Sequence, residues 1–370
     1  MDEVFVMLYR LPLLKPSSVW SSFKTGLLPV IPENEFLYGY ARCALEDAYQ
    51  LIGLKQGDII LYPDCICDVI VGPCRKLGLN VKYYPVKDDF QPEWAAVEKL
   101  VKENAKAVLT VNYFGFPQLM DKWKKIIDKY NLWWIEDNAH GCDGSYEGVA
   151  LGNWGHVSVT SLRKFIPLIS GALLIINDSK LQNSEKIAKL NTNSRIKLCK
   201  EEFLRLLGYF FRLSYIPYNK YRSVPKAKSS AFDQDWIRPK EIDALSRRLF
   251  PFIKSKLNIF SDQRRLIYYA WEKFCLKYNL KPVFPLLPEN TIPLVFPCYA
   301  ECLENQMAWL RWGRRNGIDV HTWPTLPAEI QQKGGCTVIR QDRILCFPIN
   351  QDMSENQVSG LILDRKELHQ

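Results

Sequence analysis

Asp137 and Lys164 are the two residues whose types and positions most readily suggest chemistry. Asp137 ends the apolar run LWWIED, and Lys164 follows a second β-favouring run, HVSVTSL. Because open α/β sheets bind ligands at the carboxyl ends of their strands, we expect both side chains in one crevice. The sequence therefore predicts a site with an anion at one end and an amine at the other.

Pyridoxal 5′-phosphate (PLP) is a cofactor that needs such a pair. Its aldehyde condenses with a lysine amine, and its ring accepts electrons well only while the pyridine nitrogen is protonated. A carboxylate beside that nitrogen favours the protonated ring. Lys164 is therefore the candidate catalytic amine, and Asp137 is the candidate partner of the ring nitrogen.

The same stretch resembles a known family. IEDNAHG, followed by SLRK and an apolar strand, is similar to the aspartate and lysine segments of the DegT/DnrJ/EryC1/StrS family, PLP-dependent sugar aminotransferases of fold type I. The resemblance implies that Asp137 pairs with the ring nitrogen and that Lys164 binds the cofactor covalently. It further implies that His140 lies against the ring and that Ser161 contacts the phosphate. Taken singly, each residue has an ordinary alternative, such as a helix cap for Asp137.

A second candidate phosphate contact is the start of a helix predicted from Ala41. ARCALEDAYQLIGL has apolar residues at helical spacing, and Gly53 ends the pattern. The segment resembles the family's phosphate-binding helix, with Ala41 in the place of a glycine and Arg42 in that of a small hydroxyl or arginine. Amides at a helix N-terminus bind anions generally. An ordinary amphipathic helix remains an equally good interpretation.

Cys67 stands at a position where the resembling family often stacks an aromatic ring on PLP, the fourth after Pro63. A thiol offers less stacking area than a ring, so this departure predicts weaker cofactor binding. A metal site at Cys65, Cys67 and Cys74 is the alternative. That spacing lacks a nearby fourth ligand or a paired CxxC, so no metal is expected.

The elements that must position these residues alternate along the chain. Short β-rich runs and helices follow one another from residue 55 to 176, which predicts a mostly parallel, doubly wound sheet flanked by helices. The expected class is α/β, and the resemblance implies PLP-transferase fold type I. We expect a large PLP-binding domain over residues 1–249, with an extended arm over the first 35 or so, and a smaller C-terminal α+β domain over residues 250–370.

Other segments carry weaker signals. The NYFGFP loop ends a predicted strand, so Asn112 and Tyr113 could line the site, although a loop packed by its aromatics is the simpler interpretation. Residues 180–250 are basic, with interleaved aromatics and a helical tendency; solvated, dimer-facing helices explain them better than a membrane-surface or nucleic-acid helix. The ending ILCFPINQDMSENQVSGLI again resembles the family, and Ser354 with Gln357 predicts a capping box.

Composition narrows the function classes. The 370 residues carry 49 basic against 40 acidic side chains, a formal net charge of +9 that favours anionic partners. Eleven cysteines in apolar contexts and the absence of a recognisable signal peptide favour reduced thiols in a cytoplasmic protein. The run VFVMLYRLPLL is too short and too interrupted to span a bilayer, and no basic arm suggests nucleic-acid binding.

The resemblance implies an aminotransferase that moves an amino group from an amino acid, with glutamate as the expected donor, to a nucleotide-linked keto-sugar in polysaccharide or secondary-metabolite biosynthesis. It implies a homodimer. A lysine at position 164 favours transamination over the family's dehydratase branch, in which the lysine is absent. Two alternatives stay open: a binding or regulatory protein that retains the fold without turnover, and a PLP enzyme of another reaction type.

Overall fold

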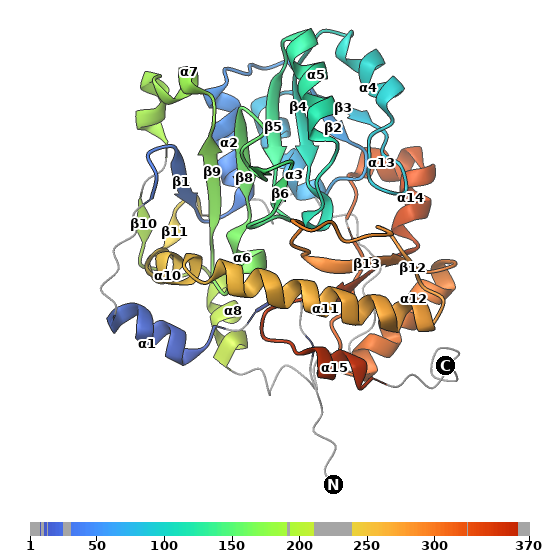
Figure 1. Ribbon diagram of the computed structural model, residues 1–370. Coiled ribbons are helices and arrows are strands. Elements are labelled where there is room, and N and C mark those ends of the chain that lie inside the picture. The colour runs from blue at the N-terminus through green and yellow to red at the C-terminus, as the bar shows by residue number, and fades with distance from the viewer. Residues whose placement is uncertain are drawn as a thin grey trace.

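A computed structural model describes residues 8, 11–12, 14–24, 31–190, 193–210, 239–323 and 325–361. A seven-stranded sheet lies at its centre, in the upper half of Figure 1. In spatial order the strands are β1 (Glu35–Tyr38), β9 (Ala172–Ile176), β8 (Val157–Thr160), β5 (Trp133–Asp137), β4 (Ala105–Val111), β2 (Ile59–Pro63) and β3 (Asn80–Tyr84).

The sheet is mostly parallel, as the alternating pattern predicted. From β8 to β3 every neighbouring pair is parallel, and β9 runs antiparallel between β8 and β1. Strands β5 and β8 are buried almost throughout, which is typical of a parallel sheet covered on both faces. The sheet thus brings the carboxyl ends of β5 and β8 side by side.

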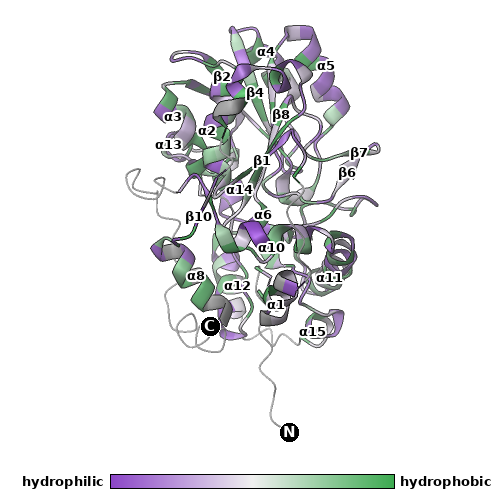
Figure 2. Cartoon of the chain, turned by 90° about the vertical axis from the view of Figure 1, so that its left-hand side faces the viewer, coloured by the Kyte–Doolittle hydropathy of each residue, from purple (hydrophilic) through white to green (hydrophobic). Residues whose placement is uncertain are grey.

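Helices connect and cover these strands. They are α2 (Ala41–Leu51), α3 (Asp68–Leu77), α4 (Trp94–Val101), α5 (Met120–Tyr130) and α7 (Ser179–Gln182). Each long helix buries one face: α5 buries Met120, Trp123, Ile126 and Ile127, a spacing of three to four residues. Its outer face is strongly polar (Figure 2). The helix predicted from Ala41 begins at that residue.

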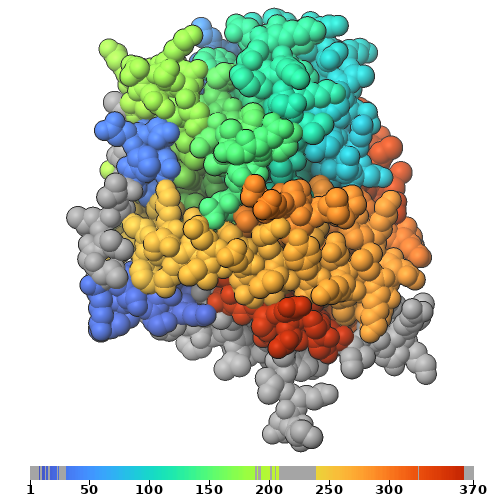
Figure 3. Space-filling view, in the orientation of Figure 1, coloured from blue at the N-terminus to red at the C-terminus, as the bar shows by residue number. Residues whose placement is uncertain are grey.

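The C-terminal region, residues 257–361, forms a second layer below the sheet. Helix α11 (Leu257–Lys277) crosses the front of the molecule (Figures 1 and 3). A three-stranded antiparallel sheet holds β12 (Lys281–Pro282), β13 (Val295–Tyr299) and β14 (Ile344–Pro348). The remaining helices are α12 (Leu303–Arg315), α13 (Ala328–Lys333), α14 (Cys336–Gln341) and α15 (Glu355–Ser359).

Aromatic packing holds this region together. Trp271 and Phe274 of α11 contact Trp309, Trp312 and Phe347, with ring centroids 4.8 to 6.4 Å apart. The predicted capping box is confirmed, because the Ser354 side chain accepts from the Gln357 amide and the Gln357 side chain accepts from the Ser354 amide. Because this region combines an antiparallel sheet with helices, it has the α+β character expected of the C-terminal part.

The N-terminal arm departs from the prediction. Residues Pro16–Lys24 form a helix, α1, where an extended chain was expected. Pro16 begins the helix, where its missing N–H is harmless and its fixed φ is already suitable. Before it, Leu8 pairs with Ile318 of the C-terminal region, so the described part of the arm packs on its own chain.

The middle of the chain is partly described. It contains a 3₁₀ turn (Glu185–Lys189), β10 (Ser194–Arg195), α8 (Lys200–Phe210), β11 (Ile242–Asp243) and α10 (Ala244–Lys254). The parallel pair β10–β11 was not foreseen by the helical tendency. Most of the basic, aromatic stretch falls in residues 211–238, outside the described residues. Among the helices that are described, none is both long and apolar enough to cross a membrane.

Candidate functional site

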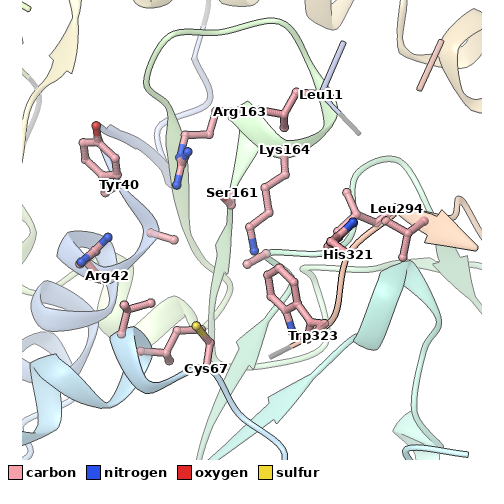
Figure 4. A pocket seen from close by; sticks show the side chains of 15 residues that line it. Leu11, Tyr40, Arg42, Cys67, Ser161, Arg163, Lys164, Leu294, His321 and Trp323 are labelled. Carbon is pink, nitrogen blue, oxygen red and sulfur yellow. The ribbon is translucent and has the colours of Figure 1, made fainter. Parts of the chain in front are cut away.

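A cavity of about 320 Å³ lies between the carboxyl ends of the central strands and the C-terminal region (Figure 4). This volume is in the range of cofactor and small-ligand sites. Residues from both layers line it: Leu11, Tyr40, Ala41, Arg42, Cys67, Val69, Ile70, Ala139, Ser161, Arg163, Lys164, Leu294, Val295, His321 and Trp323. Five of the seven predicted site residues are in this lining, and the other two are buried close to it.

Lys164 extends into the middle of the cavity (Figure 4). It belongs to α6 (Leu162–Phe165), a single turn that follows β8 directly. Its Nζ lies 4.8 Å from the centre of the Trp323 ring. A helix of four residues is not stable alone, so contacts from outside it must fix the direction of this amine.

Asp137 ends β5, beside the strand that leads to Lys164. Its side chain is buried, and its Oδ1 accepts a hydrogen bond of 2.9 Å from the Ala139 amide. Within the described residues no hydrogen bond engages Oδ2. Burial raises the pKa of the Asp137 carboxyl, and the nearby Lys164 ammonium opposes that shift. Asp137 thus keeps one oxygen for a further donor.

Glu136, the preceding residue, points to the other side of the sheet. Its carboxylate accepts from Asn112 Nδ2 at 2.8 Å and from the amides of Gly152, Trp154 and Gly155 at 2.7, 2.9 and 3.2 Å. Burial raises the pKa of Glu136, and these four donors oppose the shift. The carboxylate holds the 152–155 loop against the sheet, a role that sequence reasoning did not assign.

His140 is buried behind the cavity and is absent from its lining. Its Nδ1 accepts from the Phe114 amide at 3.3 Å, which places its proton on Nε2. Its ring meets the Trp323 ring edge to face, with centroids 4.5 Å apart. Burial, followed by the charges of Lys164 and His321, lowers the pKa of His140 well below its ordinary value. The imidazole is therefore neutral at neutral pH.

One end of the cavity collects groups that favour an anion. Helix α2 starts there at Ala41, and its N-cap, Tyr40, makes no side-chain cap bond. The guanidinium carbons of Arg42 and Arg163 lie 5.9 and 5.2 Å from the Tyr40 ring centre. Ser161, buried at the start of α6, makes no side-chain cap bond either. Since the lining includes no aspartate or glutamate, this end attracts negative charge.

Cys67 lines the cavity at the N-cap of α3, and burial raises the pKa of its thiol. Asn112 and Tyr113 do not line it. Asn112 bonds Glu136 and Asn138, and the Tyr113 hydroxyl donates to the Cys65 carbonyl at 2.8 Å. The loop is therefore packed, as the simpler interpretation had it. All eleven cysteines are free thiols, and the described residues contain no cluster of three metal-binding side chains.

Sequence reasoning missed Tyr40, Arg163, His321 and Trp323 as parts of the cavity. Arg163 lies in the SLRK segment, directly before Lys164. His321 and Trp323 lie in RRNGIDVHTWP, whose described residues form isolated bridges, Leu8 with Ile318 and His321 with Cys346, in place of a strand. Nothing in the local pattern of these residues indicates that they face Lys164.

The residues present fit PLP. An amine stands in the cavity, a buried carboxylate with an unengaged oxygen lies beside it, and a basic helix end can take the phosphate. Trp323 supplies an aromatic ring to the same cavity, although the family's usual ring position holds Cys67. Ala41, which replaces the family's glycine, still begins α2 at the cavity.

Comparisons with known proteins agree with this geometry. A family model described as the DegT/DnrJ/EryC1/StrS aminotransferase family matches residues 41–217. A UDP-4-amino-4,6-dideoxy-N-acetyl-beta-L-altrosamine transaminase of Helicobacter pylori is 26% identical over 141 residues, 38% of this chain and 37% of that protein. The GDP-perosamine synthase of Escherichia coli O157:H7 is 21% identical over 307 residues, 77% of this chain and 79% of that protein. The chain thus matches well under half the length of the first of these relatives.

Solved structures resemble the chain along nearly its whole length. PseC of Helicobacter pylori, an aminotransferase involved in pseudoaminic acid biosynthesis, superposes with a TM-score of 0.72 at 15% identity and covers 98% of both chains. The PLP-form of a putative sugar aminotransferase, Spr1654 of Streptococcus pneumoniae, gives 0.70 at 12% identity over 96% of both chains. At these identities the likeness establishes the fold, PLP-transferase fold type I. The sequence match to the DegT/DnrJ/EryC1/StrS aminotransferase family covers residues 41–217, the segment that carries Lys164 and most of the cavity lining.

Proposed function

We propose that this chain is a PLP-dependent aminotransferase that moves an amino group from an amino acid, with glutamate as the expected donor, to a nucleotide-linked keto-sugar. The observation that supports it most is the convergence of Lys164, Asp137 and the start of α2 on one cavity. When bound there, PLP supplies an electron sink for the carbanion that forms at the substrate's reacting carbon.

The chain's own residues divide the remaining tasks. Lys164 would hold the cofactor covalently, and its amine, when free, would take a proton from the donor's α-carbon. Asp137, whose Oδ1 accepts from the Ala139 amide, would offer Oδ2 to the protonated ring nitrogen. Trp323 would lie beside the ring, and neutral His140 supports Trp323 from behind the cavity. Ser161 and the amides at Ala41 and Arg42 anchor the phosphate.

The proposed substrate class rests on the charge of the cavity lining and on the names of the two relatives. The cavity lining is basic or neutral, and both relatives named above act, by their names, on UDP- or GDP-linked sugars. A diphosphate would favour the end with Arg42 and Arg163. We further propose that the enzyme works as a homodimer in the cytoplasm. Its free cysteines suit a reducing compartment.

Absorbance tests the cofactor assignment. Purified protein mixed with PLP should show a visible band that borohydride removes, and Lys164→Ala should lack it. Lys124→Ala is the matched control, because this lysine is exposed and its ion pair is with the equally exposed Asp128 of the same helix. A band that survives in Lys164→Ala would refute the assignment.

Two half-reactions test the chemistry. Glutamate alone should convert the bound cofactor to its amine form and stop there, and a UDP- or GDP-linked keto-sugar should restore the original band. A decarboxylase or synthase would not stop at the amine form, and a binding or regulatory protein would show no conversion. Light scattering on the eluting protein should give twice the 43.0 kDa chain mass; a monomer that turns over would refute the dimer.

A further inference from the structure

Arg264 of α11 is a fully buried cation that has no acidic partner within hydrogen-bond distance among the described residues. Only 1% of the residue is exposed. Burial lowers the pKa of its guanidinium to about 10, so it stays charged at neutral pH. Charged groups are rarely buried without a counter-ion unless other acceptors surround them. Its location therefore requires an explanation.

Four backbone carbonyls serve as the acceptors. Nη1 donates to Pro293, Leu294 and Ile349 at 3.2, 3.3 and 3.1 Å, and Nη2 donates to Phe165 at 3.2 Å. The guanidinium carbon also lies 4.5 Å from the centre of the Phe165 ring. One planar group thus joins three separate stretches of chain, which a lysine could not do with the same geometry.

Two of these stretches form the cavity. Phe165 is the last residue of α6 and directly follows Lys164, and Leu294 is itself in the cavity lining. The Phe165 carbonyl accepts a second hydrogen bond of 3.2 Å from Gln351 Nε2. Because α6 is a single turn, these two bonds from the C-terminal region hold its last carbonyl where the helix itself cannot.

We infer that Arg264 is a positioning residue for Lys164, because its guanidinium ties the turn that carries the lysine to the C-terminal segments beside the cavity. The inference builds on the proposed function, since it assigns Arg264 a part in aiming the amine that binds PLP. Arg264 is not part of the cavity lining. It acts through the backbone of residue 165.

The neighbouring Arg265 provides a matched control. It lies on the same helix and also donates to carbonyls, at 2.6 Å to Pro288 and 2.8 Å to Thr291, but it is half-buried and does not reach α6. A role in holding α11 to the 288–294 segment is common to both arginines. Of the two arginines, Arg264 is the one that contacts the turn carrying Lys164.

The experiment compares Arg264→Lys with Arg265→Lys in the full chain. In Arg264→Lys we expect kcat of the glutamate half-reaction to fall about 10- to 100-fold with little change in KM, as misplacement of a reacting group does. Arg265→Lys should keep wild-type kcat and KM. If Arg264→Lys lowers only the melting temperature and keeps wild-type kcat, Arg264 is merely structural and the inference fails.

A second readout needs no cofactor. The labelling rate of Lys164 by an amine-reactive reagent, followed by mass spectrometry on cofactor-free protein, should change severalfold in Arg264→Lys and stay unchanged in Arg265→Lys. If the wild type forms no PLP band, the proposed function fails, and this labelling still decides the positioning role. Should Arg264→Lys not fold, Arg264→Gln replaces it in both assays, and wild-type values for that variant would overturn the inference.

Discussion

Glu136 and Asp137 are adjacent, both fully buried, and end the same strand, yet they lie in opposite surroundings. On one face of the sheet, four donors surround the Glu136 carboxylate. On the other face, Asp137 accepts one described hydrogen bond, from Ala139, and shares its surroundings with Lys164. A buried carboxylate whose oxygens are fully hydrogen-bonded therefore stabilises the fold, whereas one with an open oxygen is available for chemistry.

Replacing Asp137 should give the largest effect and separates the two roles most clearly. Asp137→Asn should lower kcat of the glutamate half-reaction by about two to three orders of magnitude, since the ring nitrogen loses its anionic partner. The melting temperature of the cofactor-free protein should rise, by roughly 1 to 3 °C. Scanning calorimetry and single-turnover absorbance measure the two quantities.

The sign of the stability change follows from the pKa. The pKa of Asp137 is higher in the folded state than its ordinary value of 3.8. The free energy of unfolding therefore falls as pH rises from 3.8 through the folded-state pKa. At neutral pH the charged carboxylate therefore costs stability, and asparagine removes the charge. A marked drop in melting temperature would show that Asp137, too, is structural.

Glu136→Gln is the opposite test. The new side-chain NH2 would face a backbone N–H group that in the wild type donates to a Glu136 carboxylate oxygen, so one donor loses its acceptor. We expect a loss of roughly 2 to 3 kcal/mol in the free energy of unfolding. At low temperature the folded variant should keep kcat within about threefold, because Glu136 does not line the cavity. Denaturant unfolding and the half-reaction measure both. A stable variant without activity would reverse the comparison.

His140 gives the smallest effect and extends the comparison to pH. Its folded-state pKa is lowered, so the neutral ring's contribution is complete above 6.5 and is lost as pH falls below that value. Between pH 7 and 5.5, the wild type should lose about 1 kcal/mol more unfolding free energy than His140→Gln. His156, whose pKa is also lowered, titrates in both proteins and cancels. Parallel pH profiles would mean that His140 is solvated.

Much of the fold could be predicted from the sequence. The segments that form β5, β8 and β9 are short and apolar, and the helix at Ala41 has a clear apolar period. Ser354 and Gln357 form the capping box of α15. Strong local patterns of this kind survive tertiary packing. The helix at Pro16 was missed because its signal is weak and it rests on other elements, including α10.

The candidate site could be predicted only in part. Lys164, Asp137 and Cys67 each follow a strand or begin a helix, so their common location follows from the rule that ligands bind at strand ends. Trp323 and His321 reach the same cavity from the C-terminal region, more than 150 positions along the chain from Lys164. No local period carries that information.

The residues that can do chemistry are evident from the sequence, because side-chain type and position relative to a strand end are local properties. The sequence also determined the alternating elements, through the spacing of apolar residues. Three features depend on the folded chain: which acid is fully hydrogen-bonded, which aromatic ring lies near Lys164, and which buried arginine holds the turn that carries this lysine. Those outcomes depend on contacts between segments far apart in the chain, and a local pattern cannot specify such contacts.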